Sequence, residues 1–246
     1  MNCKAESASA AKNANVRHIF CTQKRFCSKS NDFMRNVERV RSSIKESASD
    51  LFGRLGYEKT SIDQIAKLAH KAKASVYYHF DSKLSIYRSV MEDEFRALRE
   101  NLEEVRERYA GKDAECMSKY LMARMEGMLK MPIYSNYMKD RIINQSYSEV
   151  AYMVNTIRKD FDEWEYRYFK SIGERGIKEG IFTDRVYPDM FAKMLENILK
   201  GLEIQFFVTD DRDAVRSTYE AMVEILIYRN PRLPENGRVT GQEERI

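Results

Sequence analysis

The most constraining feature of this sequence is the spacing of its apolar residues, which recur at steps of three and four from Val37 almost to the end. This spacing places apolar side chains on one face of an α-helix, which has about 3.6 residues per turn. All four prolines (Pro132, Pro188, Pro231 and Pro234) fall at the edges of the periodic segments or in the tail. The pattern therefore predicts an all-α chain, because proline interrupts helix interiors.

We expect about nine helices. Three of them form an N-terminal group: one from Val37 that stops at Gly56, a short one after Thr60 and Ser61, and a third over Ala72–Tyr78. Hydroxyl side chains cap helix starts, and glycine is common just past helix ends. The other six are expected after Asp81 and Ser82 to near Gly111, and over Ala114–Lys130, Tyr134–Ser146, Glu149–Glu179, Pro188–Val208 and Arg212–Arg229.

The charge of the chain is unevenly distributed. The net charge is +4, of which residues 1–35 contribute +5, residues 36–83 contribute +3 and residues 84–246 contribute −4. A basic N-terminal part followed by a mildly acidic C-terminal part is typical of a nucleic-acid-binding head on a separate body. We therefore expect a basic, disordered arm (1–35), a DNA-binding domain (36–83), a helical body (84–230) and a flexible tail (231–246).

The arm is rich in Ser, Ala, Asn and Lys and poor in acids. Three interpretations stay open at this point: an arm that touches DNA, an organellar targeting segment, or translation that begins at Met34, where the periodic pattern starts.

Cysteines predict a reducing compartment. Cys3, Cys21 and Cys27 lie in the arm and Cys116 stands alone in the rest, so no disulfide framework can hold the body together. His18, Cys21 and Cys27 match no common zinc spacing, and no metal site is expected. No window approaches about 18 consecutive apolar residues, so we expect a cytoplasmic, nucleoid-associated protein without a membrane partner.

Catalysis is not expected. The three histidines are His18, His70 and His79, and none is placed with a plausible nucleophile and carboxylate. The sequence also has no glycine-rich phosphate loop, so we expect no cofactor.

Residues 60–83 read TSIDQIAKLAHKAKASVYYHFDSK and contain two short helical segments separated by a break at His70 and Lys71. Following one amphipathic helix, they form the arrangement of a helix-turn-helix domain, whose second short helix enters the major groove. Short or basic side chains there let the backbone approach the duplex, and hydroxyl and cationic groups bind phosphate. The residues predicted to contact DNA are Thr60, Ser61, Lys71, Ala72, Lys73, Ala74, Ser75, Tyr77, Tyr78, His79 and Lys83.

These residues carry a resemblance to the TetR family of bacterial transcriptional regulators. The matching residues cover about 30 positions and are Gly56-Tyr57-Glu58-Lys59-Thr60-Ser61, Ile65-Ala66, Ala69, Ser75-Val76-Tyr77-Tyr78-His79-Phe80 and Lys83-Leu84. The tyrosine, the aromatic pair and the lysine all fall at the family's offsets. The resemblance implies a three-helix head on a helical body that binds a ligand and dimerises.

The match departs from the family pattern in the turn. His70 stands where the family has glycine, so we expect a left-handed backbone there at some cost. Lys71 replaces a small apolar residue and must extend its charged end to solvent. Ala72 replaces the serine cap and Ala74 the usual glycine, and loss of a cap costs about 1 kcal/mol.

The body is dense in methionine and aromatic residues. Methionine is adaptable and tyrosine carries a polar tip, which suits a pocket for apolar ligands, although the same spacing also fits an ordinary core. The resemblance favours the pocket, with candidates Tyr120, Met125, Met128, Tyr137, Tyr147, Met153, Trp164 and Phe169.

The last two helices are apolar on more than one face, which burial against a partner subunit would explain. The predicted dimer contacts are Phe191, Leu195, Ile198, Leu202, Phe206, Tyr219, Met222 and Leu226. In proteins that this chain resembles, these helices form a four-helix interface with their symmetry mates.

The sequence therefore predicts a homodimeric, TetR-like repressor that a small apolar or amphipathic effector releases from a palindromic operator on double-stranded DNA. The alternative is a helical scaffold or interaction module that has kept the fold and lost operator binding, with Lys71 and the missing cap as its support.

Overall fold

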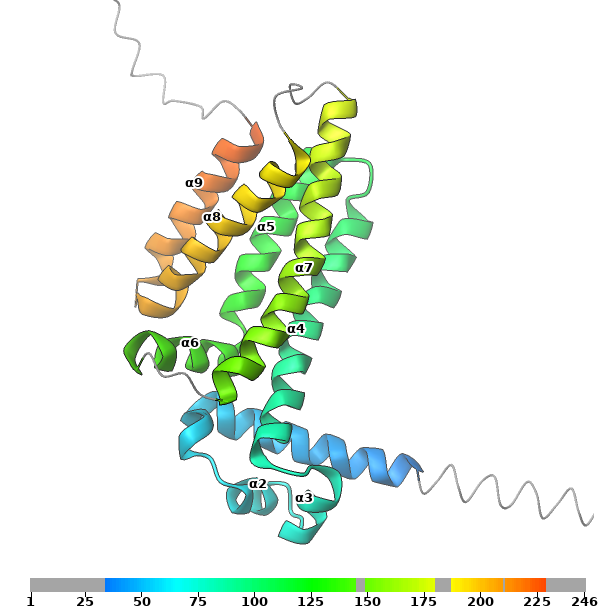
Figure 1. Cartoon of the computed structure of the whole chain (residues 1–246), viewed down its shortest axis with the longest axis vertical. Coiled ribbons are helices and arrows are strands. Elements are labelled where there is room, and N and C mark those ends of the chain that lie inside the picture. Colours follow the sequence, from blue (N-terminus) through cyan, green and yellow to red (C-terminus); the bar gives the residue numbers. More distant parts are fainter. Residues whose placement is uncertain (1–33, 145–148, 180–186, 210, 229–246) are drawn as a thin grey trace, which may run out of the picture.

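A computed structural model describes residues 34–144, 149–179, 187–209 and 211–228. All regular structure within these ranges is helical. Figure 1 shows three helices grouped at one end of an elongated molecule and the longer helices stacked beyond them. The predicted arm and tail lie almost entirely outside the described residues.

The end group consists of a first helix over residues 34–59, α2 (Ile62–Leu68) and α3 (Lys73–His79). Gly56 has φ +79°, in the left-handed region that favours glycine. The helix is nevertheless assigned through residue 59, three residues beyond the predicted stop at Gly56. Ser61 caps α2 in a reciprocal pair with Gln64, and each side chain accepts from the other residue's backbone N–H.

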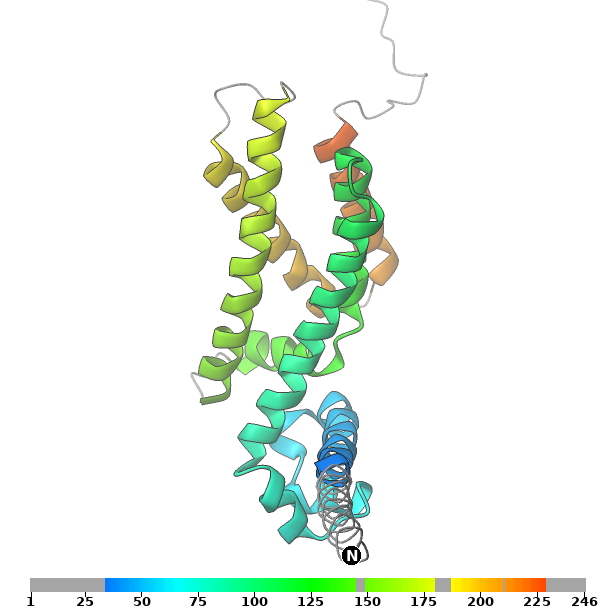
Figure 2. The same cartoon turned by 90° about the vertical axis from the view of Figure 1, so that its right-hand side faces the viewer.

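The body contains α4 (Lys83–Arg108), α5 (Asp113–Leu129), α6 (Pro132–Asn144), α7 (Glu149–Lys178), α8 (Pro188–Val208) and α9 (Arg212–Tyr228). Ser82 caps α4 and Pro188 occupies the first turn of α8, as the sequence predicted. Figure 2 shows that α4 starts in the head and continues into the body. Within the described residues, the observed helices follow the predicted pattern closely.

The head and the body share one continuous core. Phe52 and Tyr57 of the first helix pack against Tyr87 of α4, with ring centroids 4.8 and 4.9 Å from that of Tyr87. The core extends from Ile44 in the head to Val223 in α9. The division at residue 83 therefore stays a prediction about function, because no gap in the packing marks it.

The short helix α6 connects the body to the head. Glu94 of α4 accepts the backbone N–H groups of Ile133 and Tyr134 at 2.9 Å each, which satisfies two free donors in the first turn of α6. Asn136 of α6 donates to the carbonyls of Phe52 and Gly53 in the first helix, at 3.2 and 2.6 Å. One face of α6 is therefore fixed to the head.

We expect Glu94 to make stability depend on pH. Burial raises the pKa of Glu94 to about 7, against the opposing effect of its two N–H donors. A raised folded-state pKa gives a contribution that is complete below the unfolded pKa of about 4.5 and is lost as pH rises through about 7. Its size is on the order of 3 kcal/mol.

The test is urea unfolding of wild type and Glu94→Gln between pH 4.5 and 8. The difference in unfolding free energy between the two proteins should shrink or change sign as pH rises, because glutamine does not titrate. Glu100→Gln, an exposed position on the same helix, should give a difference that does not vary with pH. A constant difference for Glu94→Gln would contradict the assignment.

Candidate DNA-binding surface and effector cavity

The turn between α2 and α3 is built as the sequence predicted. His70 has φ +52°, which puts a non-glycine residue in the left-handed region. The N–H of Lys71 donates to the carbonyl of Ala66 at 2.9 Å and closes the turn. Ala72 provides no side-chain cap for α3, so the first turn of this helix has no local side-chain acceptor.

The outer face of α3 carries exposed aromatic and basic side chains. Tyr77 is 47% exposed and Tyr78 is 71% exposed, while Val76 points into the core. Lys73 is exposed and pairs with Asp63 of α2 at 2.9 Å, and this hydrogen bond raises the pKa of Lys73. Ala72 and Ala74 are exposed beside them, which leaves the backbone at the start of α3 accessible.

The remaining predicted contacts differ in their surroundings. Ser61 is exposed, but its hydroxyl accepts from the N–H of Gln64. Lys71, Ser75 and His79 are partly buried at the same surface. Lys83 donates to the carbonyl of Tyr57 at 2.9 Å, and its ammonium lies 4.1 Å from the centre of that ring.

The structure corrects the role expected for Thr60. Its side chain is 2% exposed, and its hydroxyl donates to the carbonyl of Gly56 at 2.8 Å. A hydroxyl that is buried and already bonded is not available to a phosphate group. Thr60 therefore fixes the chain reversal before α2.

Arg41 contacts the proposed DNA-binding helix, and the sequence did not indicate this contact. Its guanidinium donates to the carbonyl of His79 at 2.9 Å and lies 4.2 Å from the centre of the Phe80 ring. The first helix thus holds the C-terminal end of α3, where unpaired carbonyls attract cations. The contact joins residues 38 positions apart, so no local pattern reveals it.

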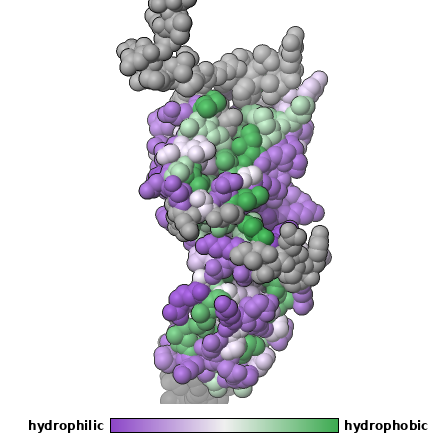
Figure 3. Space-filling view, turned by 90° about the vertical axis from the view of Figure 1, so that its left-hand side faces the viewer, coloured by the Kyte–Doolittle hydropathy of each residue, from purple (hydrophilic) through white to green (hydrophobic). Residues whose placement is uncertain are grey.

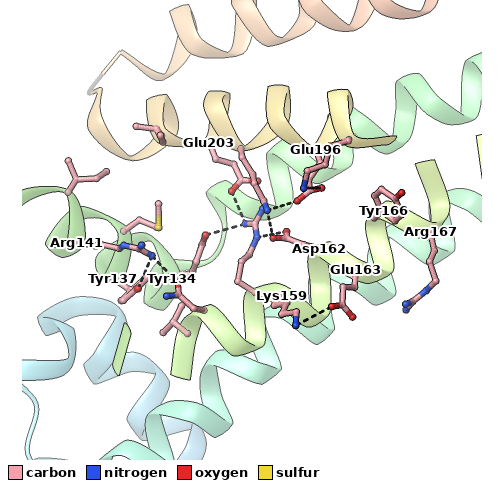
Figure 4. Close-up of a pocket in the computed structure, with 18 residues that line it drawn as sticks. Tyr134, Tyr137, Arg141, Lys159, Asp162, Glu163, Tyr166, Arg167, Glu196 and Glu203 are labelled. Carbon is pink, nitrogen blue, oxygen red and sulfur yellow. Dashed lines mark hydrogen bonds and ion pairs between the residues drawn. The ribbon is translucent and has the colours of Figure 1, made fainter. Parts of the chain in front are cut away.

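A cavity of about 1000 Å³ lies between α6, α7 and α8. Figure 4 shows Tyr134, Tyr137 and Arg141 at one end and Tyr166 and Arg167 at the other. Its apolar lining comes from Tyr134, Tyr137, Met138, Ile142, Val154 and Ile204. Its polar lining comes from Arg141 of α6 and from residues of α7 and α8.

A buried ion cluster forms the wall of the cavity next to the core. Arg124 of α5 donates to Glu165 of α7 at 2.7 Å and to Glu203 of α8 at 2.5 Å. Arg158 of α7 donates to both oxygens of Glu203, at 2.7 and 2.9 Å, and to Asp162 at 2.7 Å. Burial alone would raise the pKa of Glu203, but the two guanidinium groups hold it at about 2.

Most of the predicted pocket residues do not line this cavity. Tyr137 lines the cavity, whereas Tyr147 lies outside the described residues. The other candidates are buried in the core and do not line it: Tyr120, Met125, Met128, Met153, Trp164 and Phe169. The helical spacing of these residues is explained by their packing in the core. The cavity wall could instead have been predicted from the charged residues at inward positions of α7.

The predicted dimer residues also need correction. Leu195, Phe206 and Tyr219 are buried within their own chain, so they cannot contact a second one directly. Phe191, Ile198, Leu202 and Met222 are partly buried, and the side chain of Leu226 lies outside what the structure describes. Among the described residues of α8 and α9, the large apolar side chains that are exposed are instead Met190, Met194, Ile204 and Ile225.

The head matches a known family. Residues 44–90 match the model described as bacterial regulatory proteins, tetR family. Over 48 residues the chain is 50% identical to the biofilm operon icaADBC negative transcriptional regulator IcaR of Staphylococcus aureus, and over 56 residues it is 41% identical to IcaR of Staphylococcus epidermidis. These alignments cover 20% and 23% of this chain, and 26% and 30% of the relatives.

The head of this chain is therefore similar to the DNA-binding heads of TetR-family regulators.

Solved structures show that the TetR fold extends over the body. The regulator FadR of Bacillus subtilis, in complex with stearoyl-CoA, has a TM-score of 0.58 at 17% identity, covering 77% of this chain and 99% of that one. A TetR-family regulator of Syntrophomonas wolfei has a TM-score of 0.59 at 21% identity, covering 81% and 99%. At these identities the likeness concerns the fold alone.

Two features are absent from the part of the chain that the structure describes. No helix there is long and apolar enough to cross a membrane. No group of three or more His, Cys, Asp or Glu side chains in that part is arranged to hold a metal ion.

We expect Arg41 to act on DNA binding by positioning α3. Arg41→Gln removes a charged hydrogen bond and should weaken binding to a sequence selected from a random library by about tenfold, with less effect on random DNA. The slope of log affinity against log salt should not change, because Arg41 is not expected to touch phosphate. Fluorescence anisotropy measures both quantities.

The control for Arg41 is Arg39→Gln on the same helix, which removes an exposed arginine bonded to Asn36 and should leave the selectivity ratio intact. Arg41→Lys should recover part of the ratio. A lower salt slope for Arg41→Gln would show that Arg41 binds phosphate directly.

Lys83 remains a predicted phosphate contact, since an ammonium group has three donors and Tyr57 takes one. Lys83→Ala should lower the salt slope by about 0.9 and weaken binding to all sequences by similar factors. Lys130→Ala, an exposed lysine of the body, should leave the slope unchanged. An unchanged slope with a lower melting temperature would make Lys83 a structural residue of the head.

Proposed function

We propose that this chain is a homodimeric transcriptional repressor that binds a palindromic DNA operator and releases it when a small molecule occupies the body. The observation that carries this proposal is the surface of α3. Its outer face exposes Lys73, Tyr77 and Tyr78 at the end of the molecule farthest from α9 in Figure 1. A short helix that presents cationic and aromatic groups in this way suits insertion into a major groove.

The relatives support repression as the outcome of binding. IcaR of Staphylococcus aureus is a negative transcriptional regulator, and the chain spans about a quarter of its length. The part they share is the DNA-binding head, so the likeness speaks for operator recognition.

A second copy of the chain is the partner that best fits the α8–α9 face. Figure 3 shows apolar surface gathered on the body on the side of α8 and α9. Met190, Met194 and Ile225 contribute exposed apolar side chains there. A two-fold pair through this face would present two α3 helices to the two half-sites of a palindrome.

The cavity is the proposed effector site. It lies beside α6. Asn136 of the same helix donates a hydrogen bond to the first helix of the head. The FadR structure of Bacillus subtilis contains stearoyl-CoA, an amphipathic molecule. An amphipathic effector would also suit a cavity here that combines an apolar end with a charged wall.

The dimer is tested with Ile225→Glu, which places a charge on the proposed interface. Light scattering should show a dimer for wild type and a monomer for the variant, and affinity for a selected palindrome should fall at least about tenfold because two-site binding is lost. Tyr152→Glu, the same change at an exposed aromatic of α7, should keep the dimer.

Two outcomes would contradict the proposed function. A wild-type monomer would remove the two-fold geometry. A wild-type dimer that selects no sequence from a random library would favour the scaffold alternative, for which the uncapped start of α3 is the supporting observation.

A further inference from the structure

The charges that line the cavity are not balanced. The lining contains six cations (Arg141, Arg158, Lys159, Arg167, Lys193 and Lys200) and four carboxylates (Asp162, Glu163, Glu196 and Glu203). Each of these carboxylates is already paired with at least one of these cations. A cationic ligand would therefore find no free carboxylate among the described lining residues.

Two of the cations have no carboxylate partner among the described residues, Arg141 of α6 and Arg167 of α7. Arg141 donates to Oδ1 of Asn155 at 2.9 Å and to the hydroxyl of Tyr137 at 3.3 Å, and both of these residues line the cavity. Both arginines are exposed, but these bonds direct the Arg141 guanidinium along the cavity wall, whereas Arg167 makes no bond to another described residue. Arg141 is thus the better-oriented positive group.

Apolar surface adjoins Arg141. Met138 and Ile142 lie on the same helix, and Val154 and Ile204 line the cavity from α7 and α8. A guanidinium next to an apolar wall suits a molecule that has an anionic group at one end and a hydrocarbon part behind it.

We propose that the effector of this chain is an anionic amphiphile, whose negatively charged group is bound by Arg141 while its apolar part covers Met138, Ile142, Val154 and Ile204. The proposal rests on the proposed function, because it names the ligand class of the same cavity.

The position of Arg141 also gives the ligand a route to the head. Arg141 and Asn136 belong to the same 13-residue helix, and Asn136 holds the carbonyls of Phe52 and Gly53. An anion that draws Arg141 away from Asn155 changes the position of α6, and with it the hold on the first helix. Only a ligand that favours one position of α6 over the other can shift DNA binding.

The test compares three ligands of equal chain length by isothermal titration calorimetry of the full chain: decanoate, decanol and decylamine, each below its micelle concentration. Decanoate should bind at least about tenfold more tightly than decanol, because a hydrogen bond to a charged group contributes more than one to a neutral group. Decylamine should bind most weakly. Equal or tighter binding of decylamine would overturn the proposal.

Variants locate the site. Arg141→Gln should weaken decanoate binding by about tenfold or more and leave decanol binding unchanged, and Arg141→Lys should restore most of the preference. Lys139→Gln, an exposed lysine of α6 outside the cavity, is the matched control and should bind like wild type. A preference for decanoate that survives in Arg141→Gln and disappears in Arg167→Gln would move the anion to the other end and overturn the assignment.

One experiment distinguishes failure of the proposed function from failure of the proposed ligand class. The same preparations are titrated with the selected palindrome, with and without saturating decanoate. Decanoate binding by a chain that selects no DNA would overturn the repressor and leave the ligand class standing. DNA binding by a chain that ignores decanoate, or prefers decanol, would overturn the ligand class alone. The Asn136→Ala variant should still bind decanoate, but decanoate should release DNA from this variant less effectively than from wild type.

Discussion

The buried cluster around Arg124 and Glu203 is the interaction on which the body depends. It joins α5, α7 and α8 through contacts of 2.5 to 2.9 Å, in a region where either charge alone would be very costly. Such a cluster does not add much stability compared with apolar packing, but it permits few alternative arrangements of the three helices. Because Arg158 and Glu203 also line the cavity, the same constraint fixes the wall that a ligand meets.

Helix α6 contacts both the cavity and the head. Glu94 fixes its start, Asn136 fixes one face to the first helix, and Tyr137 and Arg141 belong to the cavity. The helix has 13 residues and packs on the body through Tyr134, whose ring lies beside those of Phe95 in α4 and Phe207 in α8, whereas the longer α7 and α8 pack extensively against each other. A displacement within the cavity is therefore more easily taken up by α6 than by the walls formed by α7 and α8. This difference in packing gives the proposed effector a mechanical route to the proposed DNA-binding surface.

The helices could be predicted from the sequence because their signals are local. Ser61 and Ser82 mark starts, Pro188 marks the first turn of α8, and the left-handed backbone at His70 follows from the pattern of the turn. The cavity could not be predicted in the same way. Met125 and Phe169 have the spacing of pocket residues and the burial of core residues, and spacing alone does not separate the two. The contact between Arg124 and Glu203 spans 79 positions, which only the tertiary structure brings together.

The head shows how a long-range contact replaces a missing local one. Helix α3, the proposed recognition helix, has seven residues, no side-chain cap at Ala72 and a non-glycine residue at the left-handed position before it, so its local sequence favours it weakly. Arg41 acts at the opposite end, by a hydrogen bond to His79 and by stacking on Phe80. Since Arg41 belongs to the first helix, and Asn136 holds that helix near Phe52, the orientation of α3 is tied to α6 through a single rigid element. A head whose recognition helix relies on the first helix in this way responds to a movement of that helix more strongly than one whose recognition helix is capped locally.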